Sequence, residues 1–501
     1  MGRSRDESLL DHGPAVDAPL SSSGRRVLSG ALWNYGAQAV TIVLQFGYAA
    51  ITSRTVAAEG FGAYAVSLAV VGLVTLLATG GLGQAVGRLA DLERPAVRGL
   101  QTYGWVLGSG AALVLVLSGG VWASFWGNST AAEPIRWLSI VALIAPSTGL
   151  ATGLMRRTGR FKDLSIITIL ANTVSMIVGV IATVIWPTTL ALIVSPIVAQ
   201  LLTLSLATYA ERELVAGFAW PRRAGSAIQF SRNLMYASML SYISANTVKF
   251  GFSHAHGGSA FGAWNRAEVL STVPFQHIQN ALIQAVYPEF RHYTQSGVRA
   301  RRVWTDLLVL VAAVTLPISA VAAGILPMLV PIFFGPGWAQ SAHLVGVLAL
   351  AGGVQVVSVV LASAVEALGR FRWVWSTDMI LILVQAVGVV AVFRSESILI
   401  GPLVLIIAAV VRHLWQIVLC TRAGYLDAAL LTRQYFGIIV VCTILGLTTW
   451  TLVNFTSDWQ VYIRLGLLIG FIASVALCAW IMRSWIHPYQ IFRSYLGSKG
   501  A

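Results

Sequence analysis

Long apolar stretches recur along this chain, separated by short polar connections. A helix needs about 20 mostly apolar residues to cross the hydrocarbon core of a bilayer. The pattern predicts spanning helices at 29–52, 62–86, 100–124, 136–155, 163–186, 189–210, 232–252, 266–288, 304–326, 340–363, 373–393, 397–420, 435–455 and 460–482. The seventh and eighth segments are the most polar of these. The expected fold is an all-α, polytopic membrane protein with about 14 transmembrane helices.

Charged residues support this assignment. Only 10% of the 501 residues are charged, whereas a soluble domain carries about 25%. The net charge of +14 does not indicate nucleic acid, because the basic residues form small clusters between apolar segments. With a cytoplasmic N-terminus, all but six of the 33 Lys and Arg residues fall on the inner side, the six being Arg54, Arg136, Lys249, Arg266, Arg394 and Arg464. The bias predicts the cytoplasmic (inner) membrane, with both termini in the cytoplasm.

An internal repeat predicts two lobes of six helices. Phe61-Gly62-Ala63-Tyr64 and Phe261-Gly262-Ala263-Trp264 open the second and eighth segments, and Gly159-Arg160-Phe161-Lys162 and Gly369-Arg370-Phe371-Arg372 join equivalent pairs. We expect a disordered cytoplasmic tail (1–28), an N-terminal lobe (29–210), a cytoplasmic linker (211–231), a C-terminal lobe (232–420), two further helices (435–482) and a cytoplasmic tail (483–501). Parallel repeats place a substrate path between the lobes.

Polar residues inside the predicted spans usually face a cavity or one another. Three helices carry them with helical spacing: the first has Asn34, Gln38, Thr41 and Gln45, the seventh has Tyr242, Asn246 and Lys249, and the eighth has Arg266, Glu268, His277, Asn280 and Gln284. These stripes predict a polar path at the junction of the lobes. The amides could equally hold helices together by hydrogen bonds, and Lys249 could snorkel to the membrane surface.

The sign of the intramembrane charge suggests the ligand. The cations in or beside the spans are Arg54, Lys249, Arg266 and, less centrally, Arg412; the acids are Glu268, Glu366 and Asp378. No acid lies near Lys249 in sequence, so we expect uncompensated cations that face the cavity. Such a cavity suits a diphosphate, which arginine grips through paired hydrogen bonds and lysine as a point charge. We interpret His413 as a packing residue, and His254 and His256 as residues of an outer loop.

Signatures of enzymes are missing from the sequence. No GxxxxGK[ST] loop for nucleotide binding and no DxD pair is present, and Glu211 and Glu213 lie in a short basic loop. The three cysteines, Cys420, Cys442 and Cys478, lack the spacing of metal ligands. We expect no enzymatic activity, no cofactor and no metal.

Several motifs carry a resemblance to a known family. The first motif is Ile51-Thr52-Ser53-Arg54 followed by Glu59-Gly60-Phe61-Gly62, and the second is the connection at residues 156–162. The third runs from Phe261-Gly262 to Arg266, is followed by Pro274, and continues at residues 286–290. The fourth begins at Leu326-Pro327 and includes residues 333–338. Their order is similar to that of the polysaccharide transporters, the O-antigen and exopolysaccharide flippases of the multidrug/oligosaccharidyl-lipid/polysaccharide superfamily. The resemblance implies two lobes around a cationic cavity, alternating access and a polyprenyl-diphosphate-linked oligosaccharide as substrate. One departure is Ala245-Asn246-Thr247-Val248-Lys249, which lacks the acid that this family often has late in helix 7.

The leading functional hypothesis is therefore a flippase of cell-surface polysaccharide biosynthesis. Its expected partners are the lipid-linked oligosaccharide, membrane lipid and, further, glycan polymerase or glycosyltransferases, with no nucleic acid. Three alternatives remain at this point: a drug or cation exporter of the same superfamily, a membrane glycosyltransferase, polymerase or ligase, and a non-transporting scaffold of a glycan assembly complex.

Overall fold

The described residues of the chain form an all-helical structure. A computed structural model describes residues 22–89, 92–215, 217–221, 225–293 and 298–481, and no β-strand occurs among them. Helices suit a chain in lipid because they pair their own backbone groups within one segment. The all-α class expected from the sequence is confirmed.

The helices follow the predicted spans closely. The first half contains α1 (Ser22–Thr55), α2 (Ala58–Thr79), α3 (Leu82–Ala85), α4 (Arg94–Phe125), α5 (Ala132–Arg157), α6 (Phe161–Ile185), α7 (Thr189–Ala210) and α8 (Arg212–Val215). The second half contains α9 (Gly225–Tyr293), α10 (Val298–Phe334), α11 (Ala339–Ala367), α12 (Phe371–Arg394), α13 (Ile400–Arg422), α14 (Ala428–Phe455) and α15 (Val461–Ile481).

Ten helical segments of the described chain are long and apolar enough to cross a membrane. The other four predicted spans coincide with α1, the two arms of α9, and α15, of which α15 contains a shorter apolar stretch, Tyr462–Val475. The α9 arms fall short because they are polar, as the sequence already indicated. The protein is a multi-pass membrane protein, and fourteen helices are consistent with this structure.

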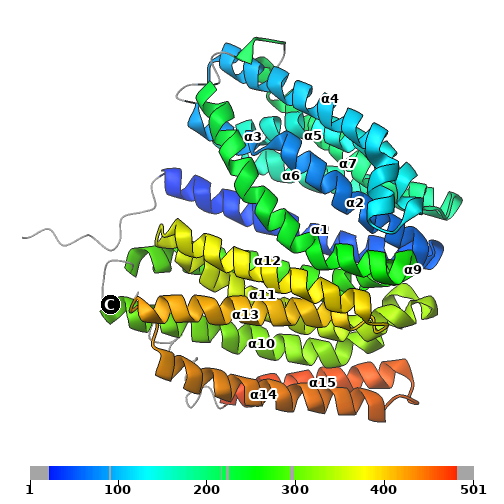
Figure 1. The fold of residues 1–501 in the computed structure, drawn as a ribbon, viewed down its shortest axis with the longest axis vertical. Coiled ribbons are helices and arrows are strands. Elements are labelled where there is room, and N and C mark those ends of the chain that lie inside the picture. Colours follow the sequence, from blue (N-terminus) through cyan, green and yellow to red (C-terminus); the bar gives the residue numbers. More distant parts are fainter. Residues whose placement is uncertain (1–21, 90–91, 216, 222–224, 294–297, 482–501) are drawn as a thin grey trace, which may run out of the picture.

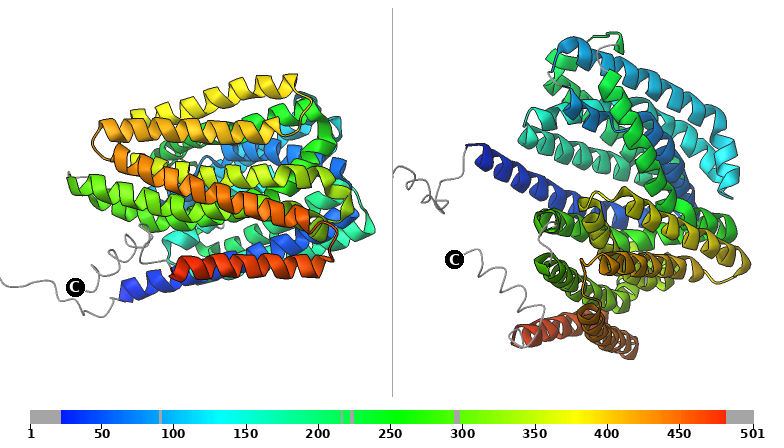
Figure 2. Two further views of the ribbon diagram at one scale, coloured as in Figure 1. Left: turned by 90° about the horizontal axis from the view of Figure 1, so that it is seen from below. Right: turned by 60° about the vertical axis from the view of Figure 1, so that its left-hand side comes forward.

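The helices lie in two groups (Figure 1). We call α2–α7 the N-terminal bundle, and α10–α13 with the second arm of α9 the C-terminal bundle. Helix α1 lies between the bundles, the first arm of α9 runs diagonally over the N-terminal bundle (Figure 1), and α14 and α15 lie at the far edge of the C-terminal bundle (Figure 2). A hydrophobic core cluster contains residues of both bundles, among them Phe61, Trp126, Phe261 and Trp338.

The two helix connections with the repeated Gly-Arg-Phe sequence have the same backbone shape. Gly159 and Gly369 both have positive φ angles, of 75° and 68°. Their amides donate to the carbonyls three residues earlier, those of Arg156 and Glu366. Glycine adopts this left-handed conformation without a steric cost, so the repeat places the same turn after α5 and after α11.

The expected outer loop between the seventh and eighth spans does not exist. Instead α9 continues from Gly225 to Tyr293, with non-helical angles inside it at Gly257 (φ 80°, ψ 178°). His254 and His256 therefore lie in a helix, and the imidazole Nδ1 of His254 is 3.2 Å from the carbonyl oxygen of Phe125. A single glycine turns the chain here, where the sequence pattern predicted a longer connection.

Two other boundaries differ from prediction. Helix α1 begins at Ser22, so residues 22–28 are helical, while residues 1–21 and 482–501 of the expected tails lie outside the described part. The second span is broken at Gly80 and Gly81, which both have positive φ angles. The carbonyl of Gly80 accepts a hydrogen bond from the Ser231 hydroxyl of α9 (2.7 Å), so the break gives α9 a polar attachment to the N-terminal bundle.

Candidate functional site

The repeated Phe-Gly sequences meet face to face where the two bundles touch. A Cβ atom added to Gly62 of α2 would lie 1.9 Å from the carbonyl oxygen of Gly258 in α9. A Cβ added to Gly262 of α9 would lie 1.8 Å from the carbonyl oxygen of Ala58 in α2. The backbones approach this closely only because both positions are glycine. Since Ala58 and Gly258 are 200 residues apart, as are Gly62 and Gly262, the contact is reciprocal.

Aromatic residues flank this contact in the same reciprocal way. Phe61 packs against Trp338, which follows α10, with ring centroids 5.5 Å apart, and Phe261 packs against Trp126, which follows α4, at 6.1 Å. We use the name Phe-Gly seam for this closed contact, which comprises Ala58, Phe61, Gly62, Trp126, Gly258, Phe261, Gly262 and Trp338. Each bundle thus supplies a tryptophan that covers the phenylalanine of the other.

Hydrogen bonds join the same two places. The Trp338 indole donates to the carbonyl of Ser53 (2.9 Å), and the Ser253 hydroxyl donates to the carbonyl of Trp126 (3.0 Å). Ser53 and Ser253 are again 200 residues apart. A backbone carbonyl buried without a partner is costly, so these bonds favour the closed seam.

Arg266 lies inside the seam, and 4% of its surface is exposed. Its guanidinium is 4.1 Å from the centre of the Phe61 ring and 6.0 Å from that of Phe334. It donates to Oδ1 of Asn265 (2.8 Å) and, more weakly, to the hydroxyl of Ser53 (3.4 Å), and its Nε is buried without a partner. No acidic residue in the described chain forms an ion pair with it. Among the described residues, the cation is therefore uncompensated.

The expectation that Lys249 is an uncompensated cation is wrong. Its ammonium is 2.7 Å from Oε1 of Glu268, with 24% and 20% of the two side chains exposed. The turn at Gly257 folds the second arm of α9 back against the first, which brings Glu268 to Lys249 although they are distant in sequence. Lys249 is therefore neutralised in this structure.

Arg412 is also paired with an acid. Its Nη2 is 2.8 Å from Oδ1 of Asp378 on α12, so our expectation of an uncompensated cation fails here as well. The neighbouring His413 is buried, and its Nε2 is 3.0 Å from the hydroxyl of Tyr435 on α14, with the rings stacked. That contact agrees with a packing role for His413.

Arg54 differs from both, since its side chain is exposed at the end of α1 and donates to the carbonyl of Ile332 in α10 (2.7 Å). It follows Ser53, which contacts Arg266. Of the three cations expected in one region, Arg54 therefore lies next to a residue that Arg266 contacts. The partner of Lys249, Glu268, lies two residues after Arg266 in α9.

The predicted amide stripes are partly exposed. Gln45, Asn280 and Gln284 are exposed, while Asn246 and His277 are half-buried. Asn246 donates to the carbonyl of Tyr242 one turn earlier (2.9 Å), which leaves less of its amide for a ligand. The side chains of Asn34 and Gln38 lie outside the described part of the structure.

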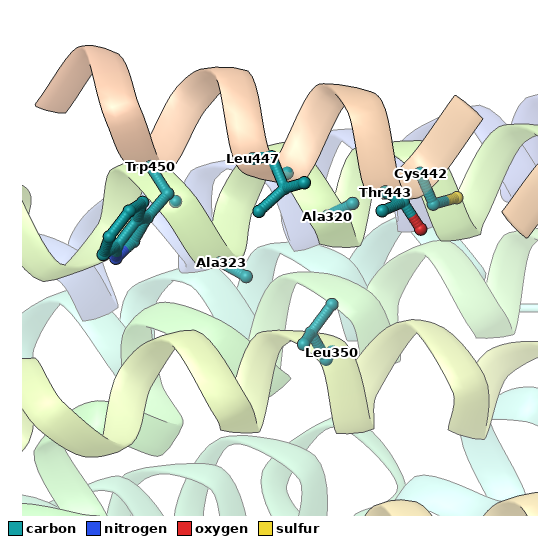
Figure 3. Close-up of a pocket in the computed structure, with 9 residues that line it drawn as sticks. Ala320, Ala323, Leu350, Cys442, Thr443, Leu447 and Trp450 are labelled. Atoms are coloured by element: carbon teal, nitrogen blue, oxygen red, sulfur yellow. The ribbon is translucent and has the colours of Figure 1, made fainter. Parts of the chain in front are cut away.

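Sequence reasoning missed an apolar pocket at the edge of the C-terminal bundle. It has a volume of about 550 Å³ and lies between α10, α11 and α14 (Figure 3). Its lining combines small residues with larger apolar ones, namely Ala320, Ala323, Gly324, Leu350, Cys442, Thr443, Gly446, Leu447 and Trp450. The small residues at 320, 323, 324 and 446 were the available signal, because they leave space between packed helices.

Comparison with known proteins assigns the chain to a group of relatives. A family model described as "Polysaccharide biosynthesis protein" matches residues 51–343. The succinoglycan biosynthesis transport protein ExoT of Rhizobium meliloti (strain 1021) is 22% identical over 64% of this chain, and the match spans 65% of that relative, just under two thirds of its length. The teichuronic acid biosynthesis protein TuaB of Bacillus subtilis (strain 168) is 22% identical over 79% of this chain and 82% of that protein.

Solved structures share the fold. A structure of the lipid II flippase MurJ in an inward closed conformation superposes with a TM-score of 0.72 over 91% of this chain and 99% of that one, at 10% identity. An inward-facing multidrug resistance MATE family transporter of the MOP superfamily superposes with a TM-score of 0.55 over 76% of this chain and 95% of that one, at 12% identity. These structures establish a MurJ/MATE-like fold.

Proposed function

The chain belongs to the polysaccharide biosynthesis protein family of the multidrug/oligosaccharidyl-lipid/polysaccharide superfamily, and we propose that it carries a polyprenyl-diphosphate-linked oligosaccharide across the cytoplasmic membrane. Its relatives ExoT and TuaB bear names of succinoglycan transport and teichuronic acid biosynthesis. The substrate of this chain is then the lipid-linked precursor of a surface polysaccharide.

The observation that carries the proposal is Arg266, a buried cation without an acidic partner in the described chain. Such a residue in a membrane protein points to an anionic ligand or to water. Its position between the bundles is where a parallel repeat places the substrate path. A diphosphate presents several negatively charged oxygen acceptors, which suit the forked guanidinium.

The apolar pocket between α10, α11 and α14 suits the other end of such a substrate. It has only one hydroxyl group, that of Thr443, among its side chains, and it adjoins α14 at the edge of the helix bundle (Figure 3). A prenyl chain gains about 0.8 kcal/mol for each methylene-sized unit that it removes from water. Within lipid that gain is absent, so the pocket would select by shape.

Alternating access completes the mechanism. The Phe-Gly seam holds the two bundles in contact, and rocking of the bundles would part it. The predicted topology puts the seam toward the outside, and with that topology we assign the closed seam to a state closed toward the outside. The seam is the element that must open for release of the sugar.

The test is complementation of a strain that depends on this protein for its surface glycan. We expect Arg266→Ala to abolish glycan accumulation while the protein remains in the membrane at normal abundance. Arg266→Lys keeps the charge but loses the fork, so it should be partly active. Normal glycan with Arg266→Ala would remove Arg266 from the site, and normal glycan after deletion of the protein would end the flippase assignment.

A drug or cation exporter is the weaker alternative. Such a protein needs an acid free to hold a cation. Two of the three acids expected in the spans, Glu268 and Asp378, already pair with Lys249 and Arg412. The third, Glu366, is exposed near the end of α11.

A further inference from the structure

The Phe-Gly seam is reciprocal in Gly62 and Gly262 and in the pairing of each phenylalanine with a tryptophan, but it is not symmetric at Arg266. The repeat relates position 266 to position 66, which is Val66. Val66 is fully buried in the hydrophobic core that both bundles share. The two copies of this packing arrangement therefore differ in charge at position 266, where an aliphatic side chain in one copy corresponds to a cation in the other.

The closed seam satisfies Arg266 incompletely. Two neutral oxygens, those of Asn265 and Ser53, and the faces of Phe61 and Phe334 are its partners, and Nε has none. A buried cation with neutral partners is less stable than one paired with an anion. Because Val66 shows that an apolar residue fits the equivalent place, packing alone does not require the arginine. The charge weakens the closed seam.

The partners of Arg266 outside its own helix belong to the closing elements. Ser53 lies near the end of α1 and accepts the Trp338 indole at its carbonyl, Phe61 opens α2, and Phe334 ends α10. Any ligand that draws the guanidinium away from these residues removes contacts from both bundles at once. Conversely, closure of the seam removes the guanidinium from the ligand.

From this asymmetry we infer that Arg266 is the residue through which a diphosphate opens the Phe-Gly seam. The diphosphate binds Arg266 only when the guanidinium leaves Ser53 and the Phe61 ring, so binding shifts the population toward the open seam. This inference rests on the proposed function for the source of the diphosphate, and it adds a role in coupling to the role of Arg266 in binding. Arg266 is a positioning residue for the seam as well as a contact for the ligand.

A cysteine beside the seam can report its opening in purified protein. Ser253 is fully buried, and its hydroxyl contacts the carbonyl of Trp126, on the side of the seam that Arg266 does not contact. Ser253→Cys is nearly isosteric, and replacing Cys420, Cys442 and Cys478 by alanine leaves the new thiol as the one thiol of the protein. We call this protein the Ser253→Cys reporter. In lipid nanodiscs both membrane faces are accessible, so its rate of maleimide labelling measures opening without any assumption about topology.

The probes are undecaprenyl diphosphate, undecaprenol and inorganic pyrophosphate. We expect undecaprenyl diphosphate to accelerate labelling of the Ser253→Cys reporter about tenfold, within the usual range of coupling between sites, and undecaprenol to have no effect. Acceleration by pyrophosphate as well would mean that the free anion suffices, whereas acceleration by the lipid alone would assign the response to the lipid headgroup. A reporter that responds to neither would overturn the inference.

The decisive variant is Arg266→Val in the reporter, which restores the symmetry of the seam. It should label more slowly than the reporter without ligand and should not respond to any probe. Arg266→Met offers a second apolar side chain, closer in length, in case the valine variant does not fold. The matched control is Arg464→Val, since Arg464 contacts the carbonyls of Ser457 and Val453 between α14 and α15, away from the seam, and it should respond like the reporter.

The outcomes separate this inference from the proposed function. If Arg266→Val or Arg266→Met opens in response to undecaprenyl diphosphate as the reporter does, Arg266 does not couple binding to opening, even when glycan export depends on it. If the reporter responds as expected but the complementation test fails, the coupling stands and the cellular assignment falls. If Arg266 had only a structural role, its replacement would leave the acceleration of labelling by undecaprenyl diphosphate unchanged.

Discussion

The glycine contact at the centre of the Phe-Gly seam makes a sharp prediction for Gly62→Ala. A Cβ at this position would lie 1.9 Å from the carbonyl oxygen of Gly258, whereas ordinary contact begins at 3.4 Å. The two bundles would have to separate by the difference, 3.4 − 1.9 = 1.5 Å. Because the obstacle is backbone, no side-chain rotation can relieve it.

Overpacking of this kind costs about 1–3 kcal/mol in protein cores, and occasionally more. A value near 3 kcal/mol lowers the population of the closed seam relative to the open one by about 150-fold. We expect Gly62→Ala to raise the labelling rate of the Ser253→Cys reporter in nanodiscs by about that factor. We also expect it to reduce surface glycan strongly, since a transporter that cannot close one end cannot complete its cycle.

The matched control is Gly110→Ala in α4, where a new Cβ meets no atom within 4 Å. Alanine is the better helix former, so this change should be neutral or slightly stabilising. Unchanged labelling and normal glycan with Gly62→Ala would refute the seam as a moving contact. The same result would show that the close approach of α2 and α9 is not required for function.

Three further predictions concern the Trp338 hydrogen bond, the Lys249–Glu268 ion pair and the topology. Trp338→Phe removes the indole donor to Ser53 and should open the seam by a factor of about five or more, whereas Trp137→Phe, at an exposed tryptophan, should not alter labelling of the Ser253→Cys reporter. Lys249→Ala and Glu268→Ala should each lower the melting temperature. The loss of unfolding free energy in the double variant should be smaller than the sum of the two single losses by about 1 kcal/mol, and strictly additive losses would contradict the ion pair. Single cysteines in 87–98, 211–231 and 291–303 should resist impermeant maleimide added to intact cells, and labelling from outside would reject the predicted topology.

Local patterns in the sequence predicted most of the helices. Residues 189–210 were predicted as a span and form α7 (Thr189–Ala210), because apolar length alone defines a helix in lipid. The polar seventh and eighth spans were also recognised, but the single-residue turn at Gly257 was not. Gly257 and Gly258 occur together in a stretch that is also typical of a loop, and only the packing of α9 on both bundles decides between the two.

The site was harder to predict, because its contacts join residues far apart in sequence. The repeat identified Phe61 and Phe261 as equivalent, but not that each packs against the tryptophan of the opposite bundle. Lys249 was not recognised as the partner of Glu268, because the two residues are brought together only by the turn inside α9. Charge signs can be read from sequence, but the pairing of charges depends on where the chain turns.

The turn at Gly257 also fixes the rotational phase between the two arms of α9. No connecting loop lies between them, so the first arm determines the direction in which every later side chain of the second arm points. One inserted residue would rotate the second arm by about 100° and advance it by about 1.5 Å. Arg266 would then leave the Phe61 ring, Glu268 would leave Lys249, and Gly262 would no longer face Ala58. The length of this junction is therefore as strict a requirement as the identity of the residues around it.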